Sequence, residues 1–134
     1  MKRILADRLD VDETQITLGN GSNDVLELAA RVALSPGSVG VVDEYCFVVY
    51  PLAIAAAHGK LARVSSVDWG PDLDEMAAAV DAATRIVYIA NPNNPTGTWV
   101  NKNSLEKFLN RVPERVWVVL DEAYFEYVLS LIHI

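Results

Sequence analysis

Two apolar segments, each followed at once by polar residues, constrain the fold of this chain more than any other feature. Residues 85–90 and 116–120 are almost wholly apolar, which is typical of strands buried on both faces of a parallel sheet. The first leads into the loop 91–97, Asn-Pro-Asn-Asn-Pro-Thr-Gly, and the second into Asp121-Glu122-Ala123-Tyr124. Parallel strands end at the same edge of a sheet, and ligands bind in the crevice beyond that edge. We therefore expect both polar segments to line one crevice.

Helical and strand patterns alternate along the rest of the chain. The patterns predict helices at 2–9, 25–34, 49–58, 72–83 and 103–110, and strands at 39–42, 61–67, 85–90 and 116–120. Residues 16–18 are expected to form a brief extended piece. Asp72 is expected to cap the helix that follows it, and Gly59 to end the helix before it. The alternation predicts an α/β fold with a mainly parallel sheet and helices on both faces.

Composition narrows the classes of function. The 134 residues are 51% hydrophobic, enough for one domain with a real core. The net charge of −7 argues against nucleic acid or an anionic membrane as a partner, and no apolar run approaches the roughly 20 residues of a membrane span. The single cysteine, Cys46, excludes an internal disulfide and fits a cytoplasmic location. The two histidines, His58 and His133, lack metal-ligand spacing, so we expect no metal site.

Asp121 is the strongest single candidate for chemistry. It follows a run of apolar residues and so emerges from a strand end of low dielectric, where an unpaired carboxylate is costly. A cationic partner would make its ionised form favourable. The simpler alternative is a strand-end aspartate that caps the next turn.

Three other segments hold candidate ligand-binding residues. The loop 91–97 cannot continue a strand and is either a rigid connector or a binding loop, with Asn94–Pro95 a candidate for a cis bond. The loop 19–23, Gly-Asn-Gly-Ser-Asn, opens a helix and is either a plain helix start or an anion site, although Asp24 disfavours a phosphate. After the strand at 39–42, an aromatic residue could stack on a flat ring, and the alternative is ordinary core packing.

The motifs together resemble those of a known enzyme family. Gly19-Asn20-Gly21-Ser22, Asn94-Pro95-Thr96-Gly97 and Asp121-Glu122-Ala123-Tyr124 are similar to segments of the pyridoxal 5′-phosphate (PLP)-dependent aminotransferases of fold type I (class I/II), most closely of their histidinol-phosphate branch. The resemblance covers residues 1–128 and implies part of the PLP-binding large domain. An aromatic aminotransferase or a threonine-phosphate decarboxylase-like enzyme shares these motifs. The alternative from another class is a non-catalytic α/β module that binds a phosphorylated ligand.

The resemblance implies residues that hold the phosphate and one face of the cofactor. Gly21, Ser22 and Asn23 would hold the phosphate of PLP. Similar enzymes have an aromatic residue three positions before a tyrosine in the segment 45–51. That register selects Phe47 as the residue that stacks on the ring, with Tyr45 as second choice.

The resemblance also implies residues that tune the cofactor ring. Asn94 and Tyr124 would reach its phenolic oxygen, and Asp121 would pair with its nitrogen and keep that nitrogen protonated, so that the ring accepts electrons. Asp121 and Tyr124 are the catalytic candidates. The implied reaction is transamination between histidinol phosphate and 2-oxoglutarate in histidine biosynthesis, carried out by a cytoplasmic homodimer.

Part of the family pattern lies outside this sequence. Family members carry the Schiff-base lysine beyond the Asp-x-x-Tyr motif, and the four lysines present match no such segment: Lys2, Lys60, Lys102 and Lys107. Residues 129–134 do not resemble the family either. We therefore expect a truncated chain with a foreign tail, inactive by itself.

Overall fold

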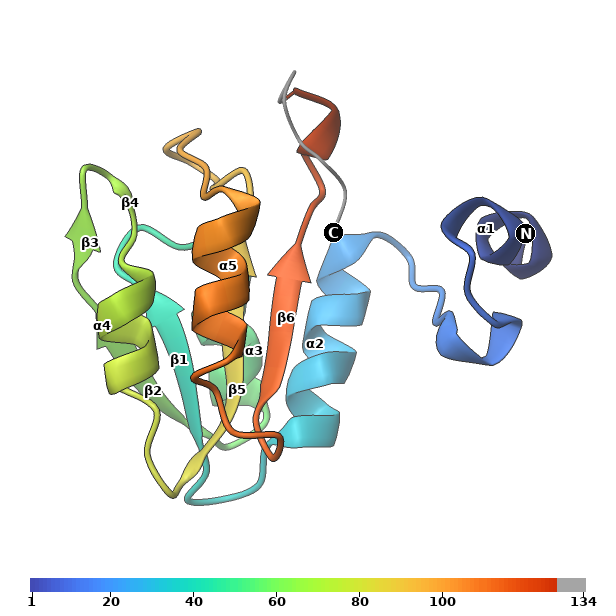
Figure 1. Cartoon of the computed structure of the whole chain (residues 1–134). Helices are drawn as coiled ribbons and strands as arrows, with labels where there is room; N and C mark the ends of the chain where they lie inside the picture. The colour runs from blue at the N-terminus through green and yellow to red at the C-terminus, as the bar shows by residue number, and fades with distance from the viewer. Residues whose placement is uncertain (128–134) are drawn as a thin grey trace.

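The computed structural model describes residues 1–127 and has a parallel β-sheet at its centre. The sheet order is β2-β1-β5-β6, and every neighbouring pair is parallel. The strands are β1 (Val39–Asp43), β2 (Lys60–Val64), β5 (Thr84–Ala90) and β6 (Trp117–Asp121). A separate antiparallel pair joins β3 (Ser66–Val67) to β4 (Gly70–Pro71). The predicted α/β fold with a mainly parallel sheet is confirmed (Figure 1).

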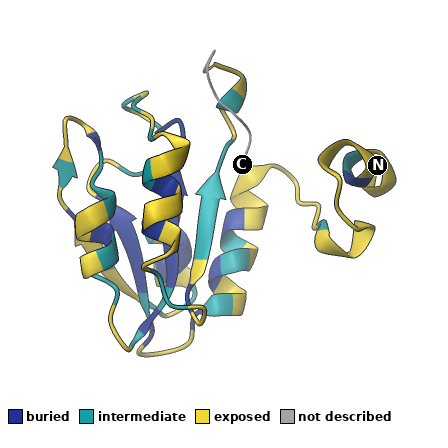
Figure 2. Ribbon diagram, in the orientation of Figure 1, coloured by how far each residue is buried: buried dark blue, intermediate teal, exposed yellow. Residues whose placement is uncertain are grey.

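Helices cover both faces of the sheet, as the alternation of patterns predicts. The helices α2 (Ser22–Ala33) and α3 (Val49–Ala56) pack on one face, and α4 (Leu73–Ala78) and α5 (Lys102–Leu109) pack on the other (Figure 1). Successive strand residues point to opposite faces, so Ile86 and Tyr88 join the first core while Val87 and Ile89 join the second. Strands β1 and β5 are the most buried, whereas most of β6 is only partly buried (Figure 2).

The N-terminal segment lies apart from this body. The predicted helix at 2–9 is confirmed as α1 (Lys2–Leu9), and the short 3₁₀ helix η1 (Glu13–Gln15) follows it. Asp12 begins η1 with a reciprocal capping box. The Asp12 carboxylate accepts from the Thr14 N–H, and the Gln15 side chain accepts from the Asp12 N–H. Figure 1 shows α1 and η1 standing away from the sheet, and most of their residues are exposed.

Several predicted boundaries differ from the structure. Residues 16–18 pair with no strand among the described residues, and Ile16 is extended as expected, with φ of −106° and ψ of 124°. The strand predicted at 61–67 is interrupted at Ser65. There β2 has ended, the chain leaves the main sheet, and β3 begins at the next residue. The helix predicted at 72–83 ends at Ala78. Beyond it the Asp81 carboxylate accepts from the N–H groups of Ala83 and Thr84, a local turn that competes with helix.

The two predicted helix caps had different outcomes. Asp72 caps α4 as predicted, because its carboxylate accepts from the N–H groups of Asp74 and Glu75. At the end of α3 the left-handed residue is His58, with φ of 59°, and not Gly59. The His58 N–H donates to the Ala55 carbonyl over 3.0 Å and the Gly59 N–H to the Ile54 carbonyl over 2.9 Å, the bond pair of a Schellman motif.

Candidate functional site

The ends of β5 and β6 lie side by side at the carboxyl edge of the sheet. Ala90 is the register partner of Asp121, and the Asn91 N–H donates to the Asp121 carbonyl over 2.9 Å. A narrow pocket opens at this point, with a cavity volume of about 40 Å³. Its lining residues are Ser22, Phe47, Ala90, Pro92, Asn94, Asp121, Ala123 and Tyr124. Five predicted site residues from four separate segments of the chain therefore meet in one place.

A second, more open hollow of about 370 Å³ adjoins the narrow pocket. The two share Pro92, Asn94 and Tyr124, and the second continues over Pro95 to Tyr127. The narrow pocket alone is well below the roughly 300–1,000 Å³ of a typical small-ligand site. A ligand ring at Asp121 would therefore extend past Asn94 and Tyr124 into the open hollow.

Two other predicted residues flank Ser22 at the start of α2 and do not line the pocket. Gly21 is the N-cap of α2 and has φ of 89°, a left-handed conformation that disfavours any side chain. Asn23 is exposed in the first turn of the helix. The Asp24 carboxylate accepts from the Asn20 N–H over 2.9 Å, so this acidic side chain is turned back towards the loop.

Both carboxylate oxygens of Asp121 have a fixed donor. The Tyr50 hydroxyl donates to Oδ2 over 2.8 Å, and the Ala123 N–H donates to Oδ1 over 3.1 Å. The aspartate thus does cap the next turn, the simpler alternative, while it also lines the pocket. Burial raises the pKa of Tyr50 well above its ordinary value, and the nearby Asp121 charge adds to the effect, so the phenol stays protonated and donates.

Tyr50 is the residue that sequence reasoning missed. It is fully buried and lies in the first turn of α3, and the family pattern uses it only as the tyrosine that sets the register of Phe47. Its partner, Asp121, is 71 positions away along the chain. Only the packing of α3 against the sheet brings the two side chains together.

The three asparagines of the loop 91–97 have different tasks. The Asn91 side chain donates to the Val100 carbonyl and accepts from the Val100 N–H, which closes the base of the loop. The Asn93 side chain donates to the Tyr45 carbonyl over 3.1 Å. Asn94 lines the pocket, and its amide has no hydrogen-bond partner among the described residues. The predicted cis bond at Asn94–Pro95 is confirmed, and Asn91–Pro92 is cis as well.

The two candidate stacking residues are separated by the structure. Phe47 lines the pocket beside Asp121. Tyr45 instead contacts Trp69, with ring centroids 5.0 Å apart. The Trp69 carbonyl in turn accepts from the Thr98 hydroxyl over 3.2 Å, so the loops after β1, β3 and β5 are tied to one another. Phe47, and not Tyr45, is in position to contact a ligand in this pocket.

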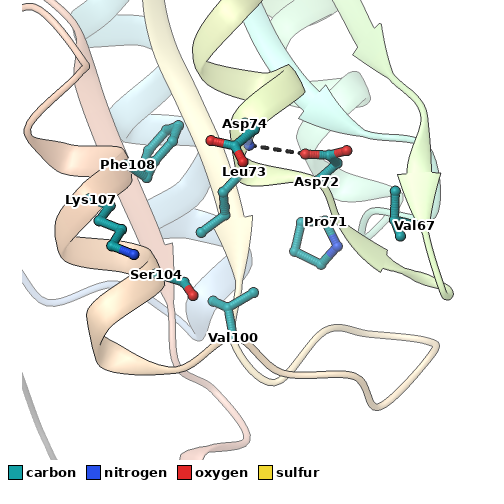
Figure 3. Close-up of a pocket in the computed structure, with 9 residues that line it drawn as sticks. All are labelled: Val67, Pro71, Asp72, Leu73, Asp74, Val100, Ser104, Lys107 and Phe108. Atoms are coloured by element: carbon teal, nitrogen blue, oxygen red, sulfur yellow. Dashed lines mark hydrogen bonds between the residues drawn. The ribbon is translucent and has the colours of Figure 1, made fainter.

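A larger cavity lies elsewhere, between the β3–β4 pair and the helices α4 and α5 (Figure 3). Asp72, the N-cap of α4, and Asp74 of that helix line it on one side, and Ser104 and Lys107 line it from α5. None of the predicted site residues borders it. Within residues 1–127, no three histidine, cysteine or acidic side chains gather as metal ligands would. No helix in the same range has the length and apolar character to cross a bilayer.

The fold and the pocket define a parallel α/β protein with a carboxylate, an amide and a phenol at the carboxyl edge of its sheet. The sequence model of the family described as "Aminotransferase class I and II" matches residues 2–132. The chain belongs to that family.

Individual relatives indicate a narrower group. The chain is 54% identical over 127 residues to histidinol-phosphate aminotransferase 2 of Pseudomonas aeruginosa, covering 95% of this chain and 34% of the relative. It is 52% identical over 128 residues to histidinol-phosphate aminotransferase 1 of Nitrosococcus oceani, covering 96% and 35%. The chain thus spans about a third of the length of the curated relatives it matches.

Solved structures agree with the sequence relatives. Histidinol-phosphate aminotransferase of Sinorhizobium meliloti in complex with PLP superposes with a TM-score of 0.87 at 32% identity, over 93% of this chain and 34% of that one. The putative histidinol-phosphate aminotransferase of Erwinia carotovora atroseptica gives a TM-score of 0.89 at 30% identity, over 96% and 38%. The predicted fold class, a partial large domain of the fold type I enzymes, is confirmed.

Proposed function

We propose that this chain forms the ring-binding part of the PLP site in an aminotransferase that acts on histidinol phosphate and 2-oxoglutarate. The observation that carries the proposal is the meeting of Asn94, Asp121 and Tyr124 in one pocket, with Phe47 and Ser22 at its sides. These residues come from separate segments, so their convergence is not a by-product of local sequence. The names of the similar proteins from Pseudomonas aeruginosa and Nitrosococcus oceani support the choice of substrate.

The donor set of the pocket fits a phosphorylated pyridine ring. Asp121 offers a carboxylate whose orientation is fixed by two donors, which suits a protonated ring nitrogen. The Asn94 amide, which has no partner within residues 1–127, and the Tyr124 phenol suit the ring oxygen, and Phe47 suits a ring face. Bound PLP would supply an electron sink for a substrate carbanion. The task of Asp121 is to keep a proton on the ring nitrogen.

The phosphate of the cofactor would lie at the start of α2. Free N–H groups at a helix N-terminus attract an anion, and Gly21 lets the backbone come close to it. Ser22 adds a hydroxyl at the pocket wall. Asp24 opposes an anion by its charge, and its hydrogen bond to the Asn20 N–H is what keeps the carboxylate turned to the loop.

The remaining parts of the proposal follow from the family resemblance. The complete protein is a cytoplasmic homodimer that takes an amino donor and a 2-oxo acid. Residues 1–128 belong to its PLP-binding large domain. The predicted tail, residues 129–134, lies outside the described residues.

By itself, the 134-residue chain should not transaminate and should not bind PLP covalently. Its four lysines are all exposed, and none lines the pocket with Asp121. The test is to add PLP to residues 1–134, reduce with borohydride and search for a pyridoxyl-lysine by mass spectrometry. The Pseudomonas aeruginosa enzyme is the positive control. A stoichiometric adduct on one specific lysine, together with transamination, would overturn this part of the proposal.

Non-covalent binding tests the pocket itself. Pyridoxamine 5′-phosphate has no aldehyde and so needs no lysine to bind. Saturable binding at millimolar ligand, lost in Asp121→Asn, is expected because the carboxylate is the main partner of the ring nitrogen. Binding that is indifferent to Asp121 would contradict the proposed site.

A further inference from the structure

We propose that Tyr50 is a positioning residue for Asp121, and that its hydroxyl holds the carboxylate in the orientation that a pyridine cofactor requires. The inference rests on the proposed PLP site and deepens it. The two side chains are joined by a 2.8 Å hydrogen bond from the Tyr50 hydroxyl to Asp121 Oδ2. Tyr50 belongs to α3, on one face of the sheet, whereas Asp121 ends a strand. A residue of the helix α3 therefore fixes the position of a side chain at the end of the strand β6.

The Tyr50 ring is itself immobilised. It is fully buried and stacks on the ring of Tyr88, with centroids 4.8 Å apart and planes 10° from parallel. The Phe47 ring meets it edge-on at 5.8 Å. Tyr88 is held in turn, since its hydroxyl donates to the Leu26 carbonyl of α2 over 2.8 Å. The phenol that reaches Asp121 therefore has little freedom to move away.

The hydrogen bonds set the plane of the carboxylate. With Tyr50 on Oδ2 and the Ala123 N–H on Oδ1, one donor occupies each oxygen, and each oxygen keeps a further acceptor site for a ligand. A carboxylate held in one plane keeps those acceptor sites in fixed directions, so that a protonated ring nitrogen can donate to one of them. A protonated ring nitrogen is the state that electron withdrawal needs.

Tyr50 also couples two walls of the pocket. The same ring contacts Phe47, the proposed stacking residue, and bonds Asp121, the proposed partner of the ring nitrogen. Loss of the hydroxyl would leave the ring contacts with Phe47 and Tyr88 in place and remove only the bond to Asp121. Tyr50→Phe is therefore a clean test of the hydroxyl alone.

The chain contains a matched control for this substitution. Tyr88 is also fully buried, belongs to the same ring stack and also uses its hydroxyl in a 2.8 Å hydrogen bond, but its acceptor is a backbone carbonyl. Tyr88→Phe removes the same atom from the same stack without touching Asp121. A merely structural role for buried hydroxyl groups would make the two substitutions behave alike.

The experiment uses the 134-residue chain with millimolar pyridoxamine 5′-phosphate labelled with ¹⁵N in the ring. The ¹⁵N chemical shift reports whether the bound ring nitrogen is protonated, and its titration against pH and ligand concentration gives the midpoint and the dissociation constant. In the unsubstituted chain we expect protonation to persist to higher pH than in free ligand. Tyr50→Phe should lower that midpoint and weaken binding several-fold, because the released carboxylate must then be ordered when the ligand binds. Tyr88→Phe should leave both unchanged.

Asp121→Asn separates the possible failures. If Asp121→Asn leaves the ring-nitrogen signal and the binding unchanged, the proposed cofactor site is wrong, and the role of Tyr50 is overturned with it. If Asp121→Asn abolishes the effect but Tyr50→Phe matches the unsubstituted chain, only the role of Tyr50 is overturned. An amide spectrum that shows Tyr50→Phe unfolded while Tyr88→Phe is folded would make the Tyr50 hydroxyl a determinant of folding and would also overturn the inference.

Discussion

At the scale of a single residue, Asp121 accepts hydrogen bonds from Tyr50 and Ala123 and lines the proposed cofactor pocket. Its removal therefore tests the proposed role directly. In a longer, active protein that contains this segment, Asp121→Ala should retain PLP but lower kcat by about 10²-fold or more, the cost of removing one preorganised electrostatic group. The ring nitrogen would no longer be held protonated. Steady-state kinetics and the absorbance of bound PLP measure the two effects. Tyr124→Phe is the milder comparison, and near-normal turnover in Asp121→Ala would contradict the assigned role.

Sequence alone identified the residues whose position follows from a strand end or a motif. Asp121 and Asn94 were predicted to meet because each follows a buried strand of one sheet, and they do. Tyr50 could not be found in this way, since its hydrogen bond depends on how a helix packs. The separate tasks of Asn91 and Asn93 were equally invisible, because both bind backbone groups whose positions only the folded loop defines.

At the scale of elements, Gly40 sets how closely α3 approaches β1. A Cβ atom at Gly40 would lie 2.6 Å from Cδ1 of Ile54 and 3.2 Å from Cγ2 of Ile86. Gly40→Ala should therefore destabilise the chain by about 1–3 kcal/mol through overpacking. Urea unfolding followed by circular dichroism measures the loss. Ile54→Val in the Gly40→Ala background should recover part of it, and additive effects of the two substitutions would argue against the contact.

The entry into β5 depends on an aspartate that is sensitive to pH. The Thr84 hydroxyl, with the Ala83 and Thr84 N–H groups, holds the pKa of Asp81 below its ordinary value of 3.8. A depressed pKa in the folded state stabilises the fold above the unfolded pKa, and that contribution is lost as the pH falls through the folded value.

Asp81→Asn should consequently lower the thermal midpoint near pH 7 and approach the unsubstituted chain only as the pH falls through the folded pKa of Asp81, which lies below 3.8. Thermal melts at several pH values measure the difference. Glu114→Gln, which removes an exposed carboxylate from the loop before β6, is the control. A difference that stayed constant as the pH fell from 7 to well below 3.8 would show that charge on Asp81 does not matter.

Helices and strands were predictable where local interactions or deep burial determine the hydrophobic pattern of the sequence. Strands β1, β5 and β6 were found because their apolar runs are buried on both faces or half-covered. The end of α4 was missed because the alanine-rich stretch after it favours helix by propensity, while the Asp81 turn overrides that preference. The β3–β4 pair was missed because a two-residue strand has no pattern to read.

At the scale of the whole molecule, β6 is an outer strand of the sheet. No other strand of residues 1–127 pairs with its outer side, and Trp117 on this strand is 52% exposed. Unpaired edges with apolar side chains promote association between chains. We expect the 134-residue chain to associate with itself as its concentration rises.

Trp117→Lys should raise several-fold the concentration at which the chain associates, because a charged side chain on an edge strand opposes strand pairing. Sedimentation velocity over a concentration series measures this. Trp99→Lys makes the same chemical change at an exposed tryptophan in the loop between β5 and α5. Trp99 belongs to no strand, so this substitution should have little effect. Equal effects of the two would indicate that general hydrophobicity, and not the edge, drives association.

The ties between the loops after β1, β3 and β5 have a consequence for the dynamics of the carboxyl edge. Asn93 bonds the Tyr45 carbonyl, Tyr45 contacts Trp69, and the Trp69 carbonyl accepts from Thr98. Irregular loops ordinarily exchange their amide hydrogens quickly and independently. Here each loop can open only by breaking bonds to another, so the three should open together as one cooperative unit. The part of the pocket that Phe47 and Asn94 line would then keep its shape after one ligand leaves and before the next one binds.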